Sequence, residues 1–172
     1  LSYETLKAAG VAVDSTDPAG LKVLVGGRET AAFVTAFKGP MRAGNYILFY
    51  APAAAAEQAV EVKWGAEALR MEAVYAAPGE GEAMWYGVAS EAGELAFETS
   101  PDVTRYLLIG FPEEAVLMLD VTDALRPRFL YGYGWLQVEG QAGIYLGYEG
   151  DPAKLLAVGD SAVVEVEQVS VP

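Results

Sequence analysis

The feature that most constrains the fold of this chain is its repeated alternation of short apolar stretches with turn residues. Leu21–Val25 and Val60–Trp64 place apolar side chains at every second position, and each is followed by glycine. A period of two is typical of β-strands, and many short strands separated by turns indicate a sandwich or barrel. We therefore predict an all-β fold, a sandwich-like module or modules of mostly antiparallel strands. Further strands are expected at Ala32–Phe37, Tyr46–Tyr50, Leu69–Ala73, Met84–Val88, Leu95–Phe97, Arg105–Phe111, Val116–Val121, Phe129–Val138, Ile144–Tyr148, Leu155–Val158 and Val163–Val171.

One short helix is predicted at the N-terminus. Ser2 can accept a hydrogen bond from a free backbone N–H of the first turn, and Glu4 places a negative charge where the helix dipole favours it. Leu1 and Leu6 have the spacing of a hydrophobic staple, and Gly10 is a typical stop. The helix spans about two turns and needs packing to be stable.

Turn-rich segments suggest how the chain is divided. We predict an N-terminal β sub-block with the helix over residues 1–80, a linker or hairpin over 81–94, and a C-terminal β sub-block over 95–172. A single continuous sandwich is the alternative. Ala53–Ala56 is interpreted as a loop edge because Pro52 precedes it and the run is short.

Composition limits the possible partners. The chain carries 24 acidic and 11 basic residues, a net charge of −13, and the basic residues do not cluster. A nucleic-acid backbone or an anionic membrane would repel such a body. No apolar run approaches the roughly 20 residues that a membrane-spanning helix needs. We predict no nucleic-acid partner, no membrane insertion and no cofactor.

Catalytic chemistry is also constrained, because the sequence contains no cysteine and no histidine. Catalytic triads built on histidine and thiolate ligands for a metal are therefore excluded. No phosphate-binding glycine loop occurs, and the paired carboxylates lie in polar, turn-rich segments typical of solvated surface. We predict that the chain is not an enzyme, and keep a carboxylate-dependent enzyme as the third hypothesis.

The most unusual motif is Tyr131-Gly132-Tyr133-Gly134-Trp135. On one strand, the three aromatic side chains would share a face. They could form a platform on which sugar rings stack, which makes Tyr131, Tyr133 and Trp135 the candidate ligand-binding residues. The alternative, which we favour, is that they belong to the core, where large aromatics are common. We favour the core for Trp135 and one of the two tyrosines, because the glycines leave the other face without side chains to bury.

Asp120 and Asp123 form the second candidate site. Two carboxylates beside Thr122 at a strand end could hold Ca²⁺, which takes six to eight oxygen ligands. The favoured interpretation is an Asx turn, in which each aspartate binds nearby backbone N–H groups.

Two groups of segments carry a resemblance to a known family. The first comprises Tyr3–Gly10, Asp17-Pro18, Leu21, Gly27 and Gly44–Tyr50, and the second comprises Tyr106–Phe111, Leu119–Asp123, Pro127 and Leu155–Val158. Together they resemble the non-catalytic, N-terminal β-rich region of gingipain-type cysteine peptidases. The first group is similar to the start of that region, although Asn45 stands where the family usually has aspartate. The second is similar to the segment directly before the peptidase domain, although Ala124 stands where the family has proline after Thr-Asp.

The resemblance includes no catalytic residue, because the family's histidine and cysteine lie in a downstream domain. It implies a secreted or cell-surface multidomain parent, of which this chain is a mature or excised part, and neighbouring domains of that parent as partners. We therefore expect a non-catalytic accessory module. The alternative is a carbohydrate-binding module that uses the aromatic strand face, with a glycan as partner.

Overall fold

The structure is a computed structural model that describes residues 1–36, 38–52, 59–76, 81–111, 115–138, 141–166 and 168–171. Strands account for 46% of it and helices for 8%, so the predicted all-β fold is confirmed. The chain divides into two compact units. Unit 1 comprises Leu1–Met71, Asp123–Pro127 and Glu165–Pro172, and unit 2 comprises Glu72–Thr122 and Arg128–Val164. The expected loop at Ala53–Ala56 lies outside the described residues.

Unit 1 contains the single α-helix that the structure describes. Helix α1 (Tyr3–Ala8) begins at Ser2, whose hydroxyl accepts from the Thr5 backbone N–H, as predicted. Leu1 and Leu6 both enter the core of this unit, which they share with the remaining buried residues Val11, Val13, Leu21, Val23, Ala32, Met41, Ile47 and Val62.

Two small antiparallel sheets complete unit 1. The first has the order β2-β1-β5, and the second pairs β3 with β4. Gly26 and Gly27 join β1 to β2 with φ values of 57° and 76°, a left-handed geometry that favours glycine in two-residue hairpins. The strands are β1 (Leu21–Val25), β2 (Arg28–Thr30), β3 (Ala32–Val34), β4 (Ile47–Phe49) and β5 (Val60–Trp64).

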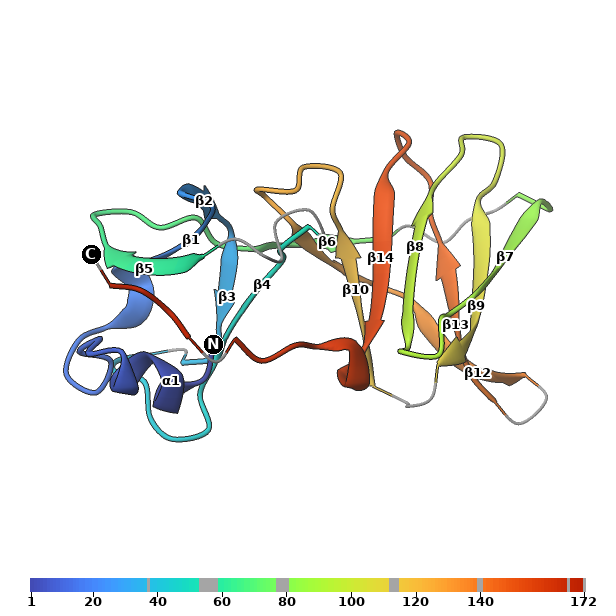
Figure 1. The fold of residues 1–172 in the computed structure, drawn as a ribbon. Helices are drawn as coiled ribbons and strands as arrows, with labels where there is room; N and C mark the ends of the chain where they lie inside the picture. The colour runs from blue at the N-terminus through green and yellow to red at the C-terminus, as the bar shows by residue number, and fades with distance from the viewer. Residues whose placement is uncertain are drawn as a thin grey trace. The chain divides into compact units, whose positions relative to one another are not determined.

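Unit 2 is a β-sandwich (Figure 1). One sheet has five strands in the order β6-β11-β10-β14-β8, and the other has four in the order β12-β13-β9-β7. All neighbours are antiparallel except β6 with β11 and β7 with β9. The strands are β6 (Glu72–Tyr75), β7 (Met84–Val88), β8 (Glu94–Glu98), β9 (Arg105–Phe111), β10 (Val116–Asp120), β11 (Arg128–Tyr131), β12 (Gly134–Val138), β13 (Gln141–Gly147) and β14 (Lys154–Gly159).

The core of unit 2 lies between the two sheets. Tyr106 and Leu108 of β9 and Ile144 of β13 belong to the same buried cluster as Met118 of β10 and Leu155 of β14. In a β-sandwich, two sheets pack face to face, and alternate residues of their strands fill the space between them. Residues 81–94, for which the sequence suggested a linker or hairpin, lie inside unit 2 and include β7.

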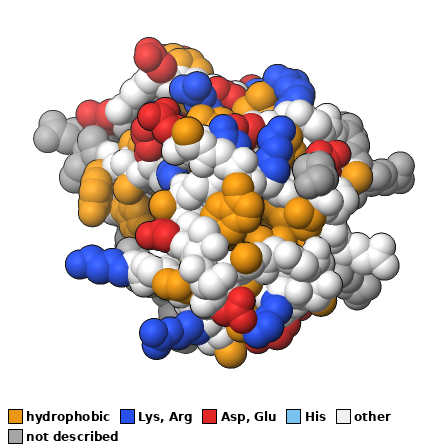
Figure 2. Space-filling model, turned by 90° about the vertical axis from the view of Figure 1, so that its left-hand side faces the viewer, with side chains coloured by type: hydrophobic (Ala, Val, Ile, Leu, Met, Phe, Trp, Pro, Cys, Tyr) orange, Lys and Arg blue, Asp and Glu red, His pale blue; other side chains and the backbone are white. Residues whose placement is uncertain are grey.

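Charge is distributed unequally between the units. By sequence, unit 2 contains 14 acidic and 3 basic residues, a net charge of −11, whereas unit 1 contains 10 acidic and 8 basic residues, a net charge of −2. Unit 2 therefore carries nearly the whole net charge of the chain. On the face drawn in Figure 2, acidic (red) and basic (blue) side chains are interspersed around hydrophobic ones (orange).

Candidate functional site

The predicted row of three aromatic residues is not formed, because the strand breaks at Gly132. Tyr131 ends β11 in the five-stranded sheet, whereas Trp135 lies on β12 in the four-stranded sheet. Gly132 has a φ of 90°, and a Cβ atom there would lie 3.0 Å from the Ala76 carbonyl oxygen. This left-handed, crowded position favours glycine and turns the chain from one sheet to the other. The prediction of one strand over Phe129–Val138 is therefore wrong.

Tyr133 is the tyrosine that packs against the core. Its ring contacts the buried cluster of unit 2, and its hydroxyl donates to the Val116 carbonyl oxygen at 2.9 Å. Burial raises the pKa of Tyr133, and the nearby Tyr131 phenol adds to the effect. The expectation that one of the two tyrosines belongs to the core is confirmed.

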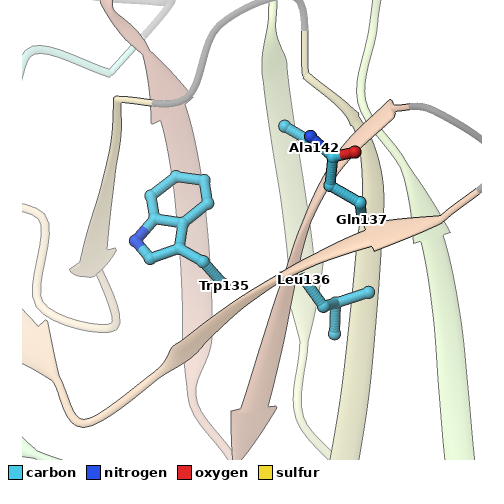
Figure 3. A pocket seen from close by; sticks show the side chains of 4 residues that line it. All are labelled: Trp135, Leu136, Gln137 and Ala142. Atoms are coloured by element: carbon cyan, nitrogen blue, oxygen red, sulfur yellow. The ribbon is translucent and has the colours of Figure 1, made fainter.

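Trp135 is 47% exposed, so its assignment to the core is wrong. It lies opposite Ile144, which is fully buried, but β12 is the edge strand of its sheet. Tyr133 occupies the position next to the core and meets the indole ring edge-on, with centroids 6.1 Å apart and ring planes at 70°. Trp135, Leu136, Gln137 and Ala142 line an open hollow here, and the indole projects from β12 on the side opposite to Leu136 (Figure 3).

Tyr131 belongs to a different aromatic group. It pairs in register with Tyr75 of β6, and the two ring centroids lie 5.7 Å apart at a tilt of 35°. Tyr131 is 42% exposed and Tyr75 is 78% exposed. The exposed aromatics of the predicted site are thus split between this pair and Trp135.

The Asx-turn interpretation is confirmed for both aspartates. An Asp120 carboxylate oxygen accepts from the Thr122 N–H at 3.0 Å, and the Asp123 carboxylate accepts from the Leu125 N–H at 3.0 Å. Asp120 is buried and also accepts a hydrogen bond from the Arg128 guanidinium. Burial alone would raise the pKa of Asp120, but the bonds from Thr122 and Arg128 outweigh it and hold this pKa below its ordinary value.

Metal ligation at these aspartates lacks a supporting cluster. Within the described ranges, no three His, Cys, Asp or Glu side chains lie close enough together to hold an ion. Both carboxylates have backbone donors that account for their positions.

We expect Ca²⁺ to leave the melting temperature of the chain unchanged. A specific site at 100 times its dissociation constant would add about 2.7 kcal/mol to the free energy of unfolding. Thermal unfolding with and without Ca²⁺ tests this expectation. A saturable increase in melting temperature that disappears in Asp120→Ala, with Asp102→Ala as control, would establish a calcium site instead.

The outer face of the four-stranded sheet is an apolar surface that the sequence analysis did not identify. Trp85, Tyr106 and Ile144 point into the sandwich, so the alternate residues of the same strands face outward. Tyr86 is in register with Leu107 and Tyr145, and Val88 is in register with Ile109, Gly143 and Leu136. A Cβ atom built on Gly143 would touch both Ile109 and Leu136, which places these side chains on one face.

This outer face is exposed and nearly free of charge. Tyr86 is 64% exposed and Val88 is 65% exposed, while Leu107, Ile109, Leu136 and Tyr145 are half-buried. Arg105 is the one charged side chain among the outward positions of the described strands β7, β9, β12 and β13. None of the 14 acidic residues of unit 2 occurs at these positions. We call the side chains of Met84, Tyr86, Val88, Leu107, Ile109, Leu136 and Tyr145 the outer apolar face.

One sequence signal could have identified this face. Tyr106-Leu107-Leu108-Ile109 is apolar at four successive positions rather than at alternate ones. A continuous apolar run is typical of a strand that is covered on both sides. In the described structure, β9 has the sandwich core on one side and the exposed outer apolar face on the other.

Comparison of the chain with protein-family profiles, with curated proteins and with solved structures finds no match. Among the described residues, no helix has the length and apolarity needed to cross a membrane.

Proposed function

We propose that this chain is a non-catalytic accessory module of a secreted or cell-surface multidomain protein, and that it docks onto another domain through the outer apolar face. The single observation that carries the proposal is a strand, β9, that is apolar on both sides but covered by core on one side only. Exposed apolar patches of this kind mark interaction sites, because leaving them in water forgoes the free energy of burial.

The charge pattern supports a docking role. Unit 2 has a net charge of −11, yet its acidic residues are absent from the outward positions of this sheet. Depletion of charge at the centre of a patch with charged surroundings is the usual composition of a protein interface. A second copy of the chain is a poor occupant, since two bodies of this charge repel one another.

The non-catalytic part of the proposal is supported by the residues that are absent from the sequence. The chain has neither histidine nor cysteine, so a catalytic role would have to rest on carboxylates alone. Glu91 and Glu94, one of the carboxylate pairs in the turn-rich segments, are both exposed. The resemblance to the region upstream of a gingipain-type peptidase domain agrees with an accessory role and with export.

A single introduced cysteine tests the docking proposal, because the chain has no cysteine of its own. We expect a thiol-labelling reagent to modify Tyr86→Cys rapidly in the isolated chain. In the full protein, the same reaction should be slower by a factor of about ten or more. Tethering raises the effective concentration of a neighbouring domain to millimolar levels, so even a weak interface stays closed. Labelling rates are read at the modified peptide by mass spectrometry.

Val164→Cys is the matched control, since Val164 is 83% exposed and lies outside the outer apolar face. Its labelling rate should be the same in both forms. Equal rates at position 86 in the isolated chain and the full protein would refute docking at this face. A natural protein with the mass of these 172 residues alone would refute the accessory-module proposal.

A further inference from the structure

We propose that the hollow beside Trp135 binds a neutral carbohydrate. The site consists of the indole of Trp135 and the side-chain amide of Gln137, with Ala142 of the neighbouring strand in register with Gln137. Leu136, which also lines the hollow, belongs to the outer apolar face, whereas Trp135 and Gln137 lie on the other side of β12. The proposal therefore does not depend on the docking proposal. Of the three aromatic residues singled out by the sequence, Trp135 is the one that carries this inference.

The indole packs against a neighbouring aromatic ring that is itself anchored. Tyr133 meets it edge-on, with a centroid separation of 6.1 Å, and Tyr133 is itself anchored by the bond from its hydroxyl to Val116. Tyr133 also packs against the core of unit 2, so the indole lies against a ring that the core holds in place. A ring that is already ordered loses little entropy on binding, which favours affinity.

The Trp135 indole and the Gln137 amide offer the two kinds of contact that a sugar ring makes, namely apolar stacking and hydrogen bonds. The flat, 47% exposed indole offers an apolar surface for the C–H face of a pyranose. Within the described residues, neither the Trp135 indole N–H nor the exposed Gln137 amide has a hydrogen-bond partner. Together they supply three N–H donors and one carbonyl acceptor for sugar hydroxyl groups.

The net charge of unit 2 selects against acidic sugars. With 14 acidic and 3 basic residues, unit 2 repels uronic acids and sulfated chains. Among the described residues that line the hollow, none is cationic. The ligand class is therefore an uncharged polysaccharide.

The Tyr75–Tyr131 pair is the competing aromatic site. Its rings are tilted by 35° to one another, so they do not form one flat platform. The hollow at Trp135 also offers an amide next to the ring, whereas the strand β6 residues beside Tyr75 offer no such group.

Affinity gel electrophoresis tests the proposal with laminarin and barley β-glucan as neutral probes and alginate as an acidic one. We expect at least one neutral probe to retard the wild-type chain and alginate to have no effect. Trp135→Ala should weaken retardation about tenfold or more, the order of loss expected when one stacking aromatic is removed. Gln137→Ala should weaken it by a smaller factor.

Tyr86→Ala is the matched control, because it removes an exposed aromatic residue from the outer apolar face and should leave retardation unchanged. Trp135→Phe, which keeps an aromatic ring and the fold, should retain part of the binding. Four results would overturn the proposal: no retardation by either neutral probe, retardation by alginate alone, retardation that survives Trp135→Ala, or an equal loss in Tyr86→Ala.

Discussion

Replacing Tyr106 by alanine is expected to lower the free energy of unfolding by about 3–5 kcal/mol, the range for removing a large buried aromatic side chain. Tyr106 is 1% exposed and is among the largest fully buried side chains of the described structure. Its ring lies 5.5 Å from that of Phe97 and 6.0 Å from that of Trp85, so it joins the two sheets of unit 2. A loss of this size is a large part of the 5–15 kcal/mol that stabilises an ordinary domain.

The Tyr106 hydroxyl makes a separate contribution. It donates to the Val103 carbonyl oxygen at 2.9 Å and accepts from the Ser100 N–H at 2.9 Å. Tyr106→Phe keeps the ring but leaves both backbone groups without this partner, and should cost about 1–3 kcal/mol.

Urea unfolding of Tyr106→Ala, Tyr106→Phe and a surface control, Tyr86→Phe, separates these contributions. The control should be neutral because Tyr86 is 64% exposed. A loss in the free energy of unfolding for Tyr106→Ala that is smaller than the minimum of about 1 kcal/mol expected for Tyr106→Phe would show that this ring does not belong to the core.

Local chemistry in the sequence predicted the elements whose determinants are local. Ser2 marked the helix start, the glycine after Leu21–Val25 marked the end of that strand, and alternation marked most strands. The Asx turns at Asp120 and Asp123 were predictable for the same reason, since an aspartate binds backbone donors two residues ahead.

Features that depend on distant partners were not predictable. β6 pairs with β11 in parallel across more than fifty residues, and nothing within either segment specifies that partner. Residues 163–171 alternate like a strand, but Ser170 forms only an isolated bridge to Glu61, and Val164 is 83% exposed. Alternation shows that a segment could pair, whereas an available sheet edge decides whether it does.

The predicted aromatic site was wrong for a related reason. The aromatic row required Gly132 to be extended, but its φ of 90° redirects the chain. Whether Trp135 is buried depends on the order of strands in its sheet, and β12 is at the edge. A sequence pattern assigns a side chain to one of two faces, but it does not reveal which strand has no neighbour.

Arg128→Ala is the second substitution with a large expected effect. The guanidinium bonds the carboxylate of Asp120, whose side chain is 4% exposed, whereas the Arg128 side chain is 44% exposed. Removing the arginine leaves a buried carboxylate with Thr122 as its remaining donor. We expect a loss of about 3 kcal/mol at pH 7, the lower end of the range for breaking a buried pair, because water already reaches Arg128.

The effect of Arg128→Ala should depend on pH in a defined direction. The wild-type pKa of Asp120 lies below its ordinary value, so this stabilisation is fully present above about pH 4 and is lost as the pH falls through the lowered, folded-state pKa. Without Arg128, one of the interactions that counteract burial is lost, so the pKa of Asp120 rises and the carboxylate takes up a proton at a higher pH. A protonated Asp120 needs no cation, so the deficit of Arg128→Ala relative to wild type should shrink as the pH is lowered from 7 toward 3.

Urea unfolding at pH 7, 5 and 3.5 measures this dependence. Lys154→Ala is the matched control, since its pair with Glu98 has a distance of 3.6 Å and both side chains are more than half exposed. Such a surface pair is worth about 0.5 kcal/mol or less, so its loss should be small at every pH. A deficit for Arg128→Ala that stays constant from pH 7 to pH 3.5 would contradict the assigned role, because a shape-only contribution of the arginine side chain does not titrate with Asp120.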